Sequence, residues 1–450
     1  MSSFDPLPLR APLKTALKRL NFTAMTPIQS ASLPMILEGK DIIAQASTGS
    51  GKTLAFALGI LNKVNPKFFA PQAVVLCPTR ELAEQVTKVI RSCASEIGNI
   101  KLLTLCGGVP MKGQIHSLTH GAHIIVGTPG RVLKLLSMNT LDLNACGTMV
   151  LDEADQMVDM GFIDDIEAIF GYLPTQRQTL LFSATYPDSI KTLSARLTHE
   201  AHFLKTQNTT AKPSITEVAY LVNDKLSALN IVMHHHAIVN AIIFCNTKIV
   251  AAELCETLNN RRIHAITLHG DMEQFHRNEA IIQFRNGSAP FLVATDVAGR
   301  GIDIEGLDAI INYDLPQQSD RYVHRIGRTG RAGMEGLAIT LISPHQKESF
   351  IALQRPCEPI ELPIAKGSKE VITPMRTICI DAGKKEKLRA GDIVGALIHE
   401  AALTKEQIGK IDQLDHLSYV ALPRELAEKI YNKLKNRPIK GRIFRLWLLD

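Results

Sequence analysis

Short apolar runs alternate with mostly helix-length segments through the first part of the chain. Six such runs lie at residues 41–46, 73–77, 102–106, 123–126, 148–151 and 179–182. Strands separated by helices are typical of βαβ units and predict a parallel sheet. Each run ends in glycine or polar residues, so these residues are expected along the carboxyl edge of the sheet, where open α/β folds bind ligands.

The alternation restarts after a polar stretch at residues 205–214, which is expected to be an interdomain linker. Five further apolar runs follow, at residues 241–245, 264–268, 291–294, 309–313 and 337–342. This half carries no phosphate-binding loop of its own. We therefore predict two tandem α/β domains with parallel sheets, at residues 1–206 and 215–353, and one nucleotide site.

A second polar segment, residues 354–374, precedes a C-terminal module at residues 374–450. There the pattern predicts a strand, a helix, two strands, a helix and a strand, at residues 377–381, 390–402, 408–422, 424–435 and 442–449. This order is the split βαβ layout, which includes RNA-recognition sheets. We predict an α+β, RRM-like domain.

The charge of the chain supports a polyanion partner for this module. The net charge is +6, yet residues 374–450 hold 15 Lys and Arg against 10 Asp and Glu, whereas the rest holds 35 against 34. Such asymmetry indicates a polyanion-binding module at the C-terminus. A solvated basic surface without a partner is the alternative.

Cysteine usage and the lack of targeting segments indicate the compartment. The eight cysteines include no CxxC pair, and most lie in apolar segments, which indicates buried free thiols and no zinc site. No apolar run reaches membrane-spanning length, and the N-terminus, MSSFDPLPLR, lacks the layout of a secretory signal. We expect a soluble, cytoplasmic protein that needs no membrane.

The stretch ASTGSGKT, residues 46–53, has the spacing of a phosphate loop without its usual first glycine. Backbone amides at Gly49 and Gly51 can curl around phosphate oxygens at a helix N-terminus. Lys52 can reach the β- and γ-phosphates, and the Thr53 hydroxyl can bind Mg²⁺. The other expected nucleotide contacts of the loop are Ser47, Thr48 and Ser50. A glycine-rich turn without a ligand is the alternative.

Three carboxylates follow the fifth apolar run, at Asp152, Glu153 and Asp155. Asp152 can hold Mg²⁺ largely through its water shell, because this ion needs only one or two protein oxygens. Glu153 is the candidate base for an attacking water. A solvated acidic loop is the alternative, but with the phosphate loop the cluster indicates hydrolysis of a nucleoside triphosphate with Mg²⁺.

The second domain supplies the arginines that the first lacks. The stretch HRIGRTGR places Arg325, Arg328 and Arg331 at three-residue spacing, beside glycines that allow close approach. Like charges this close repel unless an anion lies opposite, and an arginine finger is worth about 10³–10⁵ in rate. Hydrolysis should therefore depend on closure of the two domains. An arginine-rich surface helix is the alternative.

These motifs and their order make residues 4–342 resemble the DEAD-box RNA helicases, which have two RecA-like domains. The resemblance implies that Phe4 stacks on adenine, Gln29 hydrogen-bonds its edge and Asp303 contacts the ribose. Within the segment NFTAMTPIQ, Asn21 and Met25 depart from the glycine and proline usual there.

The resemblance also implies that Arg328 and Arg331 contact the γ-phosphate. Four coupling residues are implied: Ser183 and Thr185 link hydrolysis to unwinding, while His324 and Arg325 stabilise the closed interface.

The same resemblance implies a set of RNA contacts along the sheet edges. In the first domain these are Pro78, Thr79, Arg80, Gly107, Gly108, Thr128 and Arg131. In the second domain, residues that grip RNA or tie the domains together are Asn246, Thr247, His269, Gly270, Gln274, Arg277 and Thr295. Amides, hydroxyls and arginines of this kind suit phosphate and sugar rather than bases.

The C-terminal module is similar to the RNA-binding domain of the bacterial DbpA group, through TICIDAGKKEKLRAGDIVGAL and IKGRIFRLWLL. The group is directed to a hairpin of large-subunit (23S) ribosomal RNA near the peptidyl-transferase centre and acts in ribosome assembly. Only Tyr419 is well placed for stacking on the sheet, and Trp447 is expected in the core. The expected contacts are therefore basic edges: Lys384, Lys385, Lys387, Arg389, Lys433, Lys435, Arg437, Lys440 and Arg442.

The sequence thus predicts an ATP-dependent RNA helicase that uses ATP and Mg²⁺. Its tail would tether it to ribosomal RNA in 50S precursor particles, where the core opens a short duplex. We expect a monomer. Two alternatives remain open: an RNA clamp that closes on ATP without unwinding, and a DNA-directed translocase of the same core architecture.

Overall fold

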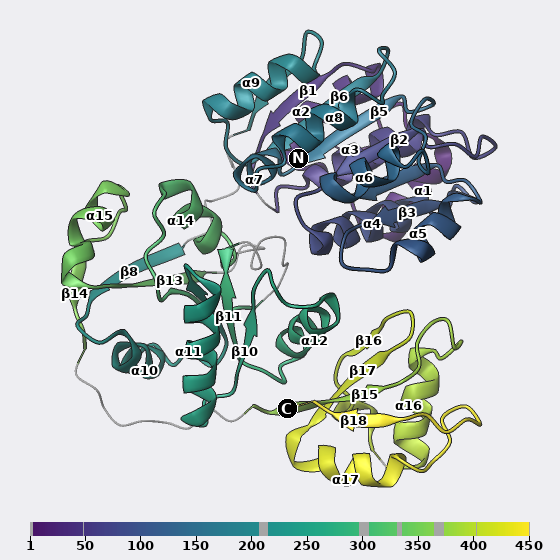
Figure 1. Cartoon of the computed structure of the whole chain (residues 1–450). Coiled ribbons are helices and arrows are strands. Elements are labelled where there is room, and N and C mark those ends of the chain that lie inside the picture. The colour runs from purple at the N-terminus through teal and green to yellow at the C-terminus, as the bar shows by residue number, and fades with distance from the viewer. Residues whose placement is uncertain are drawn as a thin grey trace. The chain divides into compact units, whose positions relative to one another are not determined.

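The computed structural model describes residues 3–47, 49–206, 215–296, 306–330, 335–363, 373–401 and 403–449. The chain divides into two compact units, Met1–Lys212 and Pro213–Asp450. The first unit holds one sheet, and the second holds two (Figure 1). No helix in the described part of the chain is both long and apolar enough to cross a membrane.

The first unit is built on a seven-stranded parallel sheet of order β3-β4-β2-β5-β6-β1-β7. Its strands are β1 (Ile42–Gln45), β2 (Ala73–Leu76), β3 (Leu102–Leu105), β4 (Ile124–Gly127), β5 (Thr148–Asp152), β6 (Gln178–Ser183) and β7 (His202–Lys205). The six predicted runs are confirmed as strands. The sequence missed β7 because this edge strand is largely exposed and has no apolar run.

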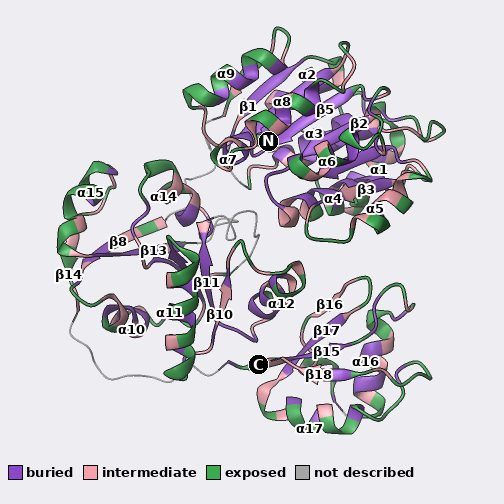
Figure 2. Cartoon of the chain, viewed as in Figure 1, coloured by how far each residue is buried: buried purple, intermediate pink, exposed green. Residues whose placement is uncertain are grey.

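Helices cover both faces of this sheet, and Figure 2 shows inner strands such as β1 and β5 as buried. The helices are α1 (Ala11–Arg19), α2 (Pro27–Glu38), α3 (Lys52–Lys63), α4 (Arg80–Ala94), α5 (Met111–Leu118), α6 (Pro129–Ser137), α7 (Ala154–Asp159), α8 (Ile163–Phe170) and α9 (Asp188–Leu197). Successive strand residues enter opposite cores: Val150 packs in one apolar cluster, and Met149 and Leu151 in the other. Burial on both faces explains why the strands read as unbroken apolar runs.

The larger sheet of the second unit has the order β10-β11-β9-β12-β13-β8-β14 and is also parallel. Its strands are β8 (Ile215–Leu221), β9 (Ala241–Cys245), β10 (Ala265–Leu268), β11 (Phe291–Thr295), β12 (Ala309–Asn312), β13 (Gly336–Ile342) and β14 (Pro359–Glu361). Described helices around it include α10 (Lys225–His235), α11 (Lys248–Asn260), α12 (Gln274–Arg285), α14 (Ser319–Ile326) and α15 (Lys347–Ala352). The sequence missed β8 and β14. Because β14 pairs with β8, this domain extends past residue 353, where the sequence placed its end.

The C-terminal module has the predicted β-α-β-β-α-β order. Its elements are β15 (Met375–Ile380), α16 (Ala390–His399), β16 (Ile411–Gln413), β17 (Ser418–Pro423), α17 (Arg424–Leu434) and β18 (Leu446–Leu448), and the antiparallel sheet has the order β16-β17-β15-β18. One face of the sheet and both helices enclose an apolar cluster that includes Ile378, Val420 and Leu397. The prediction of an RRM-like α+β domain is confirmed.

Truncation of a core aromatic should destabilise the first unit. Phe182 of β6 is fully buried, and its ring centroid lies 5.4 Å from that of Phe56. Phe182→Ala should lower the free energy of unfolding by about 3–5 kcal/mol, because it removes apolar burial and leaves a cavity. Urea titration of the full chain measures this. Tyr172→Ala is the control, since Tyr172 is 42% exposed, and a loss at Phe182 no larger than at Tyr172 would contradict the core assignment.

Candidate active site and RNA interface

The phosphate loop connects the end of β1 to the start of α3. Gly49 and Gly51 have φ values of 79° and 93°, a backbone region that favours glycine. A Cβ on Gly51 would also lie 2.4 Å from Nε2 of Gln29. Glycine at these positions therefore allows the loop to turn into the N-terminus of α3, where backbone amides favour a phosphate. Thr48 lies outside the described residues.

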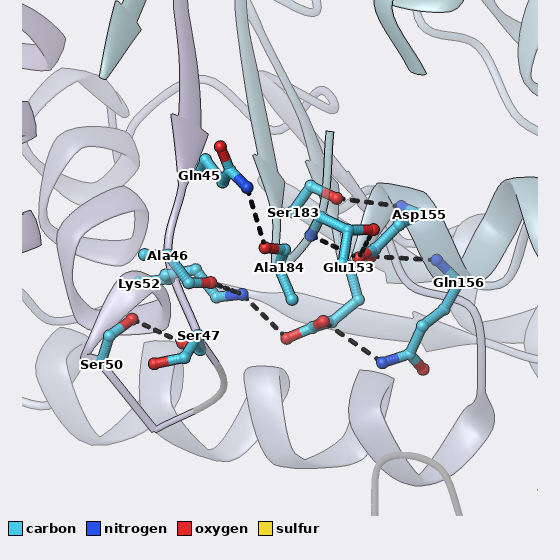
Figure 3. Close-up of polar contacts among 11 residues, drawn as sticks. Gln45, Ala46, Ser47, Ser50, Lys52, Glu153, Asp155, Gln156, Ser183 and Ala184 are labelled. Atoms are coloured by element: carbon cyan, nitrogen blue, oxygen red, sulfur yellow. Dashed lines mark hydrogen bonds and ion pairs between the residues drawn. The ribbon is translucent and has the colours of Figure 1, made fainter. Parts of the chain in front are cut away.

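Lys52 is buried at the first position of α3. Its Nζ donates hydrogen bonds to Glu153 Oε1 and to the Ala46 carbonyl oxygen, each at 2.9 Å (Figure 3). Burial by itself lowers the pKa of Lys52, but the carboxylates of Glu153 and Asp152 outweigh it, and the pKa lies above its ordinary value. The ammonium is thus held charged among carboxylates until an anion competes for it.

The acid cluster forms where β5 ends and α7 begins. Asp152 and Glu153 are 2% and 5% exposed, and Glu153 adopts a left-handed backbone with φ 54°. Burial, together with the neighbouring Glu153 carboxylate, raises the pKa of Asp152 to about 7 despite the attraction of Lys52. A strained backbone and a raised carboxyl pKa are both typical of functional sites.

Two oxygens of this site fit Mg²⁺. Asp152 Oδ1 is buried and has no hydrogen-bond partner among the described residues, which suits an oxygen that binds a ligand. Thr53 lies at the second position of α3. A carboxylate and a hydroxyl are hard oxygen donors of the kind that Mg²⁺ prefers, and this ion completes its shell with water and phosphate.

The third carboxylate connects the acid cluster to the end of β6. Asp155 Oδ2 accepts hydrogen bonds from the Thr185 amide at 2.8 Å and from Thr185 Oγ1 at 2.9 Å. The Asp155 amide donates to Ser183 Oγ at 3.2 Å. The predicted coupling residues Ser183 and Thr185 are therefore joined to the acid cluster by direct contacts, and Figure 3 shows the contact of Ser183.

Of the two expected adenine contacts, Gln29 lies beside the phosphate loop and Phe4 lies in the apolar core. Gln29 is 3% exposed, and its Nε2 donates to the Gly51 carbonyl oxygen at 3.0 Å while its Oε1 accepts from the Thr26 amide. Phe4 is 5% exposed and packs in the apolar cluster of the first unit. Their contacts with a base stay predictions.

Arg325 in the second unit is bound by groups of its own domain, and its role in the closed interface stays a prediction. It is 1% exposed, and its guanidinium binds the Asp296 carboxylate at 2.5 and 2.9 Å. The remaining donors reach Asn246 Oδ1, Asn312 Oδ1 and the Asp314 carbonyl oxygen. Because these partners follow or end β9, β11 and β12, Arg325 fixes the carboxyl edge of its sheet from inside.

Arg328, the next arginine of this motif, lies beyond the end of the helix rather than on it. Helix α14 ends at Ile326, so Arg328 follows the helix and is 6% exposed. Its neighbour Gly330 has a positive φ of 68°. Arg331 and Asp303 lie outside the described residues, and their contacts with nucleotide stay predictions.

Comparisons with known proteins identify the family. Residues 26–193 match the DEAD/DEAH box helicase family, residues 224–333 the helicase conserved C-terminal domain and residues 377–447 the DbpA RNA binding domain. The chain is 43% identical over 460 residues to the ATP-dependent RNA helicase DbpA of Escherichia coli (strain K12), which covers all of both chains. The chain belongs to the DEAD-box RNA helicases. It is a DbpA-like, RNA-dependent ATPase of this family.

Other relatives match the helicase core. The DEAD-box ATP-dependent RNA helicase CshA of Geobacillus kaustophilus (strain HTA426) is 43% identical over 349 residues, 77% of this chain and 74% of CshA. Among solved structures, S. cerevisiae Dbp5 bound to RNA and ADP BeF3 matches with a TM-score of 0.72 and 34% identity, over 79% of this chain and 93% of Dbp5. Mss116p bound to ssRNA and AMP-PNP matches with a TM-score of 0.71 and 28% identity, over 81% and 78% of the two chains.

Several predicted RNA contacts of the helicase lie at helix N-termini on the carboxyl edge of the first sheet. Thr79 and Thr128 are the N-cap residues of α4 and α6. Arg131 donates to Gln114 Oε1 at 2.9 Å, and Pro78 precedes α4. Free amides at such ends favour phosphate oxygens, so this edge is suited to an RNA backbone.

Gly108 is required because an arginine occupies its space. A Cβ on Gly108 would lie 1.6 Å from Arg80 Nη1, and the φ of Gly108 is 72°. Arg80 thus crosses from the start of α4 to the loop that follows β3. The structure brings together these two predicted RNA contacts, which are separated by 28 positions in the sequence.

The second sheet presents the same kind of edge. Thr247 is the N-cap residue of α11, and its Oγ1 accepts from the Val250 amide at 3.2 Å. Arg277 of α12 donates to the His269 carbonyl oxygen at 3.1 Å. The remaining predicted residues of this edge, Gly270, Gln274 and Thr295, lie in the loop after β10, at the start of α12 and at the end of β11.

The prediction that Tyr419 contacts RNA is wrong for this arrangement of the second unit. Tyr419 is fully buried and shares an apolar cluster with Cys379 of β15 and Ile282 of α12. Asn286 Nδ2 and Ser288 Oγ each lie 2.8 Å from Thr377 Oγ1. Helix α12 and the loop after it therefore cover the sheet face on which RNA-recognition domains stack bases. Trp447, expected in the core, is partly buried and packs against this cluster.

Six of the nine expected basic contacts of the C-terminal module lie in two loops that touch each other, and the other three, Lys433, Lys435 and Arg437, are exposed on α17 or just after it. Lys440 Nζ donates to the Lys387 carbonyl oxygen at 2.8 Å and pairs with Asp392 Oδ2 at 3.0 Å. The other basic residues of these loops are exposed: Lys384, Lys385, Lys387, Arg389 and Arg442. Lys440 thus helps to shape the edge, and the exposed cations remain available for phosphates.

Two residues of the site were missed by sequence reasoning. Gln156 donates to Glu153 Oε2, and Asp296 binds Arg325. Gln156 is three residues from Glu153, a spacing that brings side chains together on a helix. Asp296 directly follows a predicted strand, as do the other site residues, and this position was the available signal.

Removal of the candidate base should stop turnover without preventing nucleotide binding. Glu153→Gln should lower kcat of RNA-stimulated ATP hydrolysis by about 10²–10⁴, because an amide cannot accept the proton of the attacking water. Phosphate release measures the rate, and nucleotide titration measures binding. Lys67→Ala, a charge change outside the site, should leave kcat nearly unchanged. A Glu153→Gln rate within twofold of the native rate would contradict the assignment.

The raised pKa of Asp152 predicts a pH dependence of stability without nucleotide. Because the pKa is about 7 in the folded chain and 3.8 ordinarily, the folded state binds the proton more tightly. The contribution of this proton to the free energy of unfolding is complete below about pH 4 and is lost as pH rises through 7. Asp152→Asn should therefore lessen the fall in melting temperature between pH 5 and 8, whereas the exposed Asp164→Asn should not. Equal slopes in all three proteins would contradict the raised pKa.

Proposed function

We propose that this helicase opens short RNA duplexes next to structured 23S ribosomal RNA, in precursors of the 50S subunit. The observation that carries the proposal is the exposed basic edge at residues 384–389 and 440–442, within the segment that matches the DbpA RNA binding domain. Phosphate contacts from such an edge supply affinity for folded RNA. We also propose that the protein acts in the cytoplasm as a monomer.

The proposed cycle begins with the triphosphate at the N-terminus of α3. Lys52 would leave Glu153 for the β- and γ-phosphates, and Asp152 and Thr53 would hold Mg²⁺, largely through water. When bound, Mg²⁺ would neutralise charge on the phosphates. Glu153 would then accept the proton of the attacking water.

Hydrolysis would need the second unit because the γ-phosphate arginines lie on it. Arg328, with Arg331, would stabilise charge that grows on the transferred phosphoryl group. ATP binding would favour closure of the two domains on an RNA strand, and hydrolysis would release it. The contacts of Asp155 with Ser183 and Thr185 supply a route from the acid cluster to the RNA-binding edge.

The C-terminal module would present its RNA in a fixed direction rather than on a loose tether. Its sheet packs on α12 through Tyr419, Cys379 and Ile282, and α12 carries the predicted RNA contacts Gln274 and Arg277. RNA held by the basic edge would therefore lie at a constant distance from the RNA-binding edge of that domain.

Charge reversal on the basic edge tests the proposed target. Lys384→Glu with Arg442→Glu should raise the KM for a 23S fragment from near the peptidyl-transferase centre about tenfold or more, and should reduce the salt dependence of its binding. ATPase assays with this fragment and with random RNA measure the preference. The control, Lys405→Glu with Lys410→Glu, makes the same charge change outside the two loops. Equal losses in both variants would contradict the assignment of the edge.

Strand displacement separates unwinding from the alternatives. A labelled duplex of about ten base pairs beside the fragment should be opened with ATP, and the Glu153→Gln variant should not turn over. ATP-dependent retention of the RNA with no displacement of the labelled strand would favour an RNA clamp. Equal stimulation of the ATPase by DNA duplexes would favour a DNA-directed translocase.

A further inference from the structure

The two carboxylate oxygens of Glu153 are held by different side chains. Lys52 Nζ donates to Oε1 at 2.9 Å, and Gln156 Nε2 donates to Oε2 at 3.2 Å (Figure 3). In the described part of the chain, these are the two hydrogen bonds that reach this carboxylate. Gln156 is 1% exposed, so its amide is shielded from water that could replace it.

The backbone of Gln156 is fixed to the same turn. Its amide donates to the Glu153 carbonyl oxygen at 3.0 Å and lies 3.0 Å from Asp155 Oδ1. Glu153 is the N-cap residue of α7, in a left-handed backbone conformation, and Gln156 lies in the first turn of that helix. The Gln156 side chain is therefore directed onto the carboxylate by the local geometry of the acid cluster.

The lysine cannot hold Glu153 throughout the reaction. A triphosphate at the N-terminus of α3 competes for the Lys52 ammonium, since that group is the cation of the phosphate loop. Once Lys52 turns to the phosphates, Glu153 keeps the bond from Gln156. A neutral amide fixes the orientation of a carboxylate without cancelling its charge, so the carboxylate can still accept a proton.

We propose that Gln156 is a positioning residue that orients Glu153 for water activation after Lys52 has moved to the phosphates. The proposal rests on the proposed role of Glu153 as the base. A second feature supports it: Gln156 Oε1 is buried without a hydrogen-bond partner among the described residues. An unpaired buried acceptor is destabilising, so the bond to Glu153 is the evident reason to keep an amide here.

The test replaces the donor and keeps the volume. Gln156→Met should lower kcat of RNA-stimulated ATP hydrolysis about tenfold, with the KM values for ATP and RNA within about twofold. The melting temperature should not fall by more than a few degrees, because the change also removes the unpaired acceptor. Gln178→Met is the matched control, since Gln178 is a buried glutamine that binds Lys63 and two carbonyl oxygens far from the acid cluster in sequence. This control should lower the melting temperature and leave kcat nearly unchanged.

A double-mutant cycle separates positioning from a general structural role. If Gln156 acts through Glu153, Gln156→Met should have no further effect on single-turnover hydrolysis in the Glu153→Gln background. An equal loss in both backgrounds, or an unchanged kcat in the native background, would overturn the proposal. Should Gln156→Met be insoluble, Gln156→Glu keeps the size, replaces the donor by an acceptor and enters the same cycle. If Glu153→Gln retains full turnover, the assignment of Glu153 as the base is wrong. If only Gln156→Met retains the native kcat, the assignment of Gln156 is wrong and that of Glu153 stands.

Discussion

The buried ion pair between Lys52 and Glu153 is the interaction on which the catalytic arrangement depends. It joins the first residue of α3 to the residue that follows β5, and the side chains of Lys52 and Glu153 are only 4% and 7% exposed. A buried charge without its partner is strongly destabilising, so the nucleotide-free site holds each group in place by means of the other. In the proposed cycle, a triphosphate would compete for the Lys52 ammonium and would leave the Glu153 carboxylate free to accept a proton. Nucleotide binding and activation of the base would then be linked through this ion pair.

The parallel sheets explain why so many functional groups lie close together. Every strand of such a sheet ends at the same edge, and the helix that follows begins there with free backbone amides. Thr79, Thr128 and Thr247 cap three of these helices, and the phosphate loop begins a fourth. The groups offered are amides, hydroxyls and arginines, which bind phosphate and sugar. Such a set recognises RNA as a backbone and leaves the choice of RNA to another part of the chain.

The C-terminal module is suited to that choice by its edges rather than by its sheet. The face that would stack bases packs against α12 through Tyr419 and Cys379. Burial there raises the pKa of the Cys379 thiol to about 12, as expected for an apolar contact. Exposed cations lie instead in two loops connected by Lys440, and others lie on or near α17, including Lys433, Lys435 and Arg437. Affinity from such a surface depends on the shape of the folded RNA, because phosphates carry no sequence information.

The sequence by itself determined most of the elements, but not the strands β7, β8 and β14, and it indicated the chemistry that several strand ends carry. Apolar runs gave the strands, and the phosphate loop and the Asp152–Glu153 pair were recognisable from spacing, since both are local features. The tertiary structure decided which distant groups meet. Arg325 is enclosed by Asp296, Asn246 and Asp314, partners that its spacing in HRIGRTGR did not indicate. Tyr419 was expected to face RNA, but it faces α12. Such contacts depend on strand order and on the packing of whole domains, which arise from interactions between residues far apart in the chain, and no local pattern of residues encodes them.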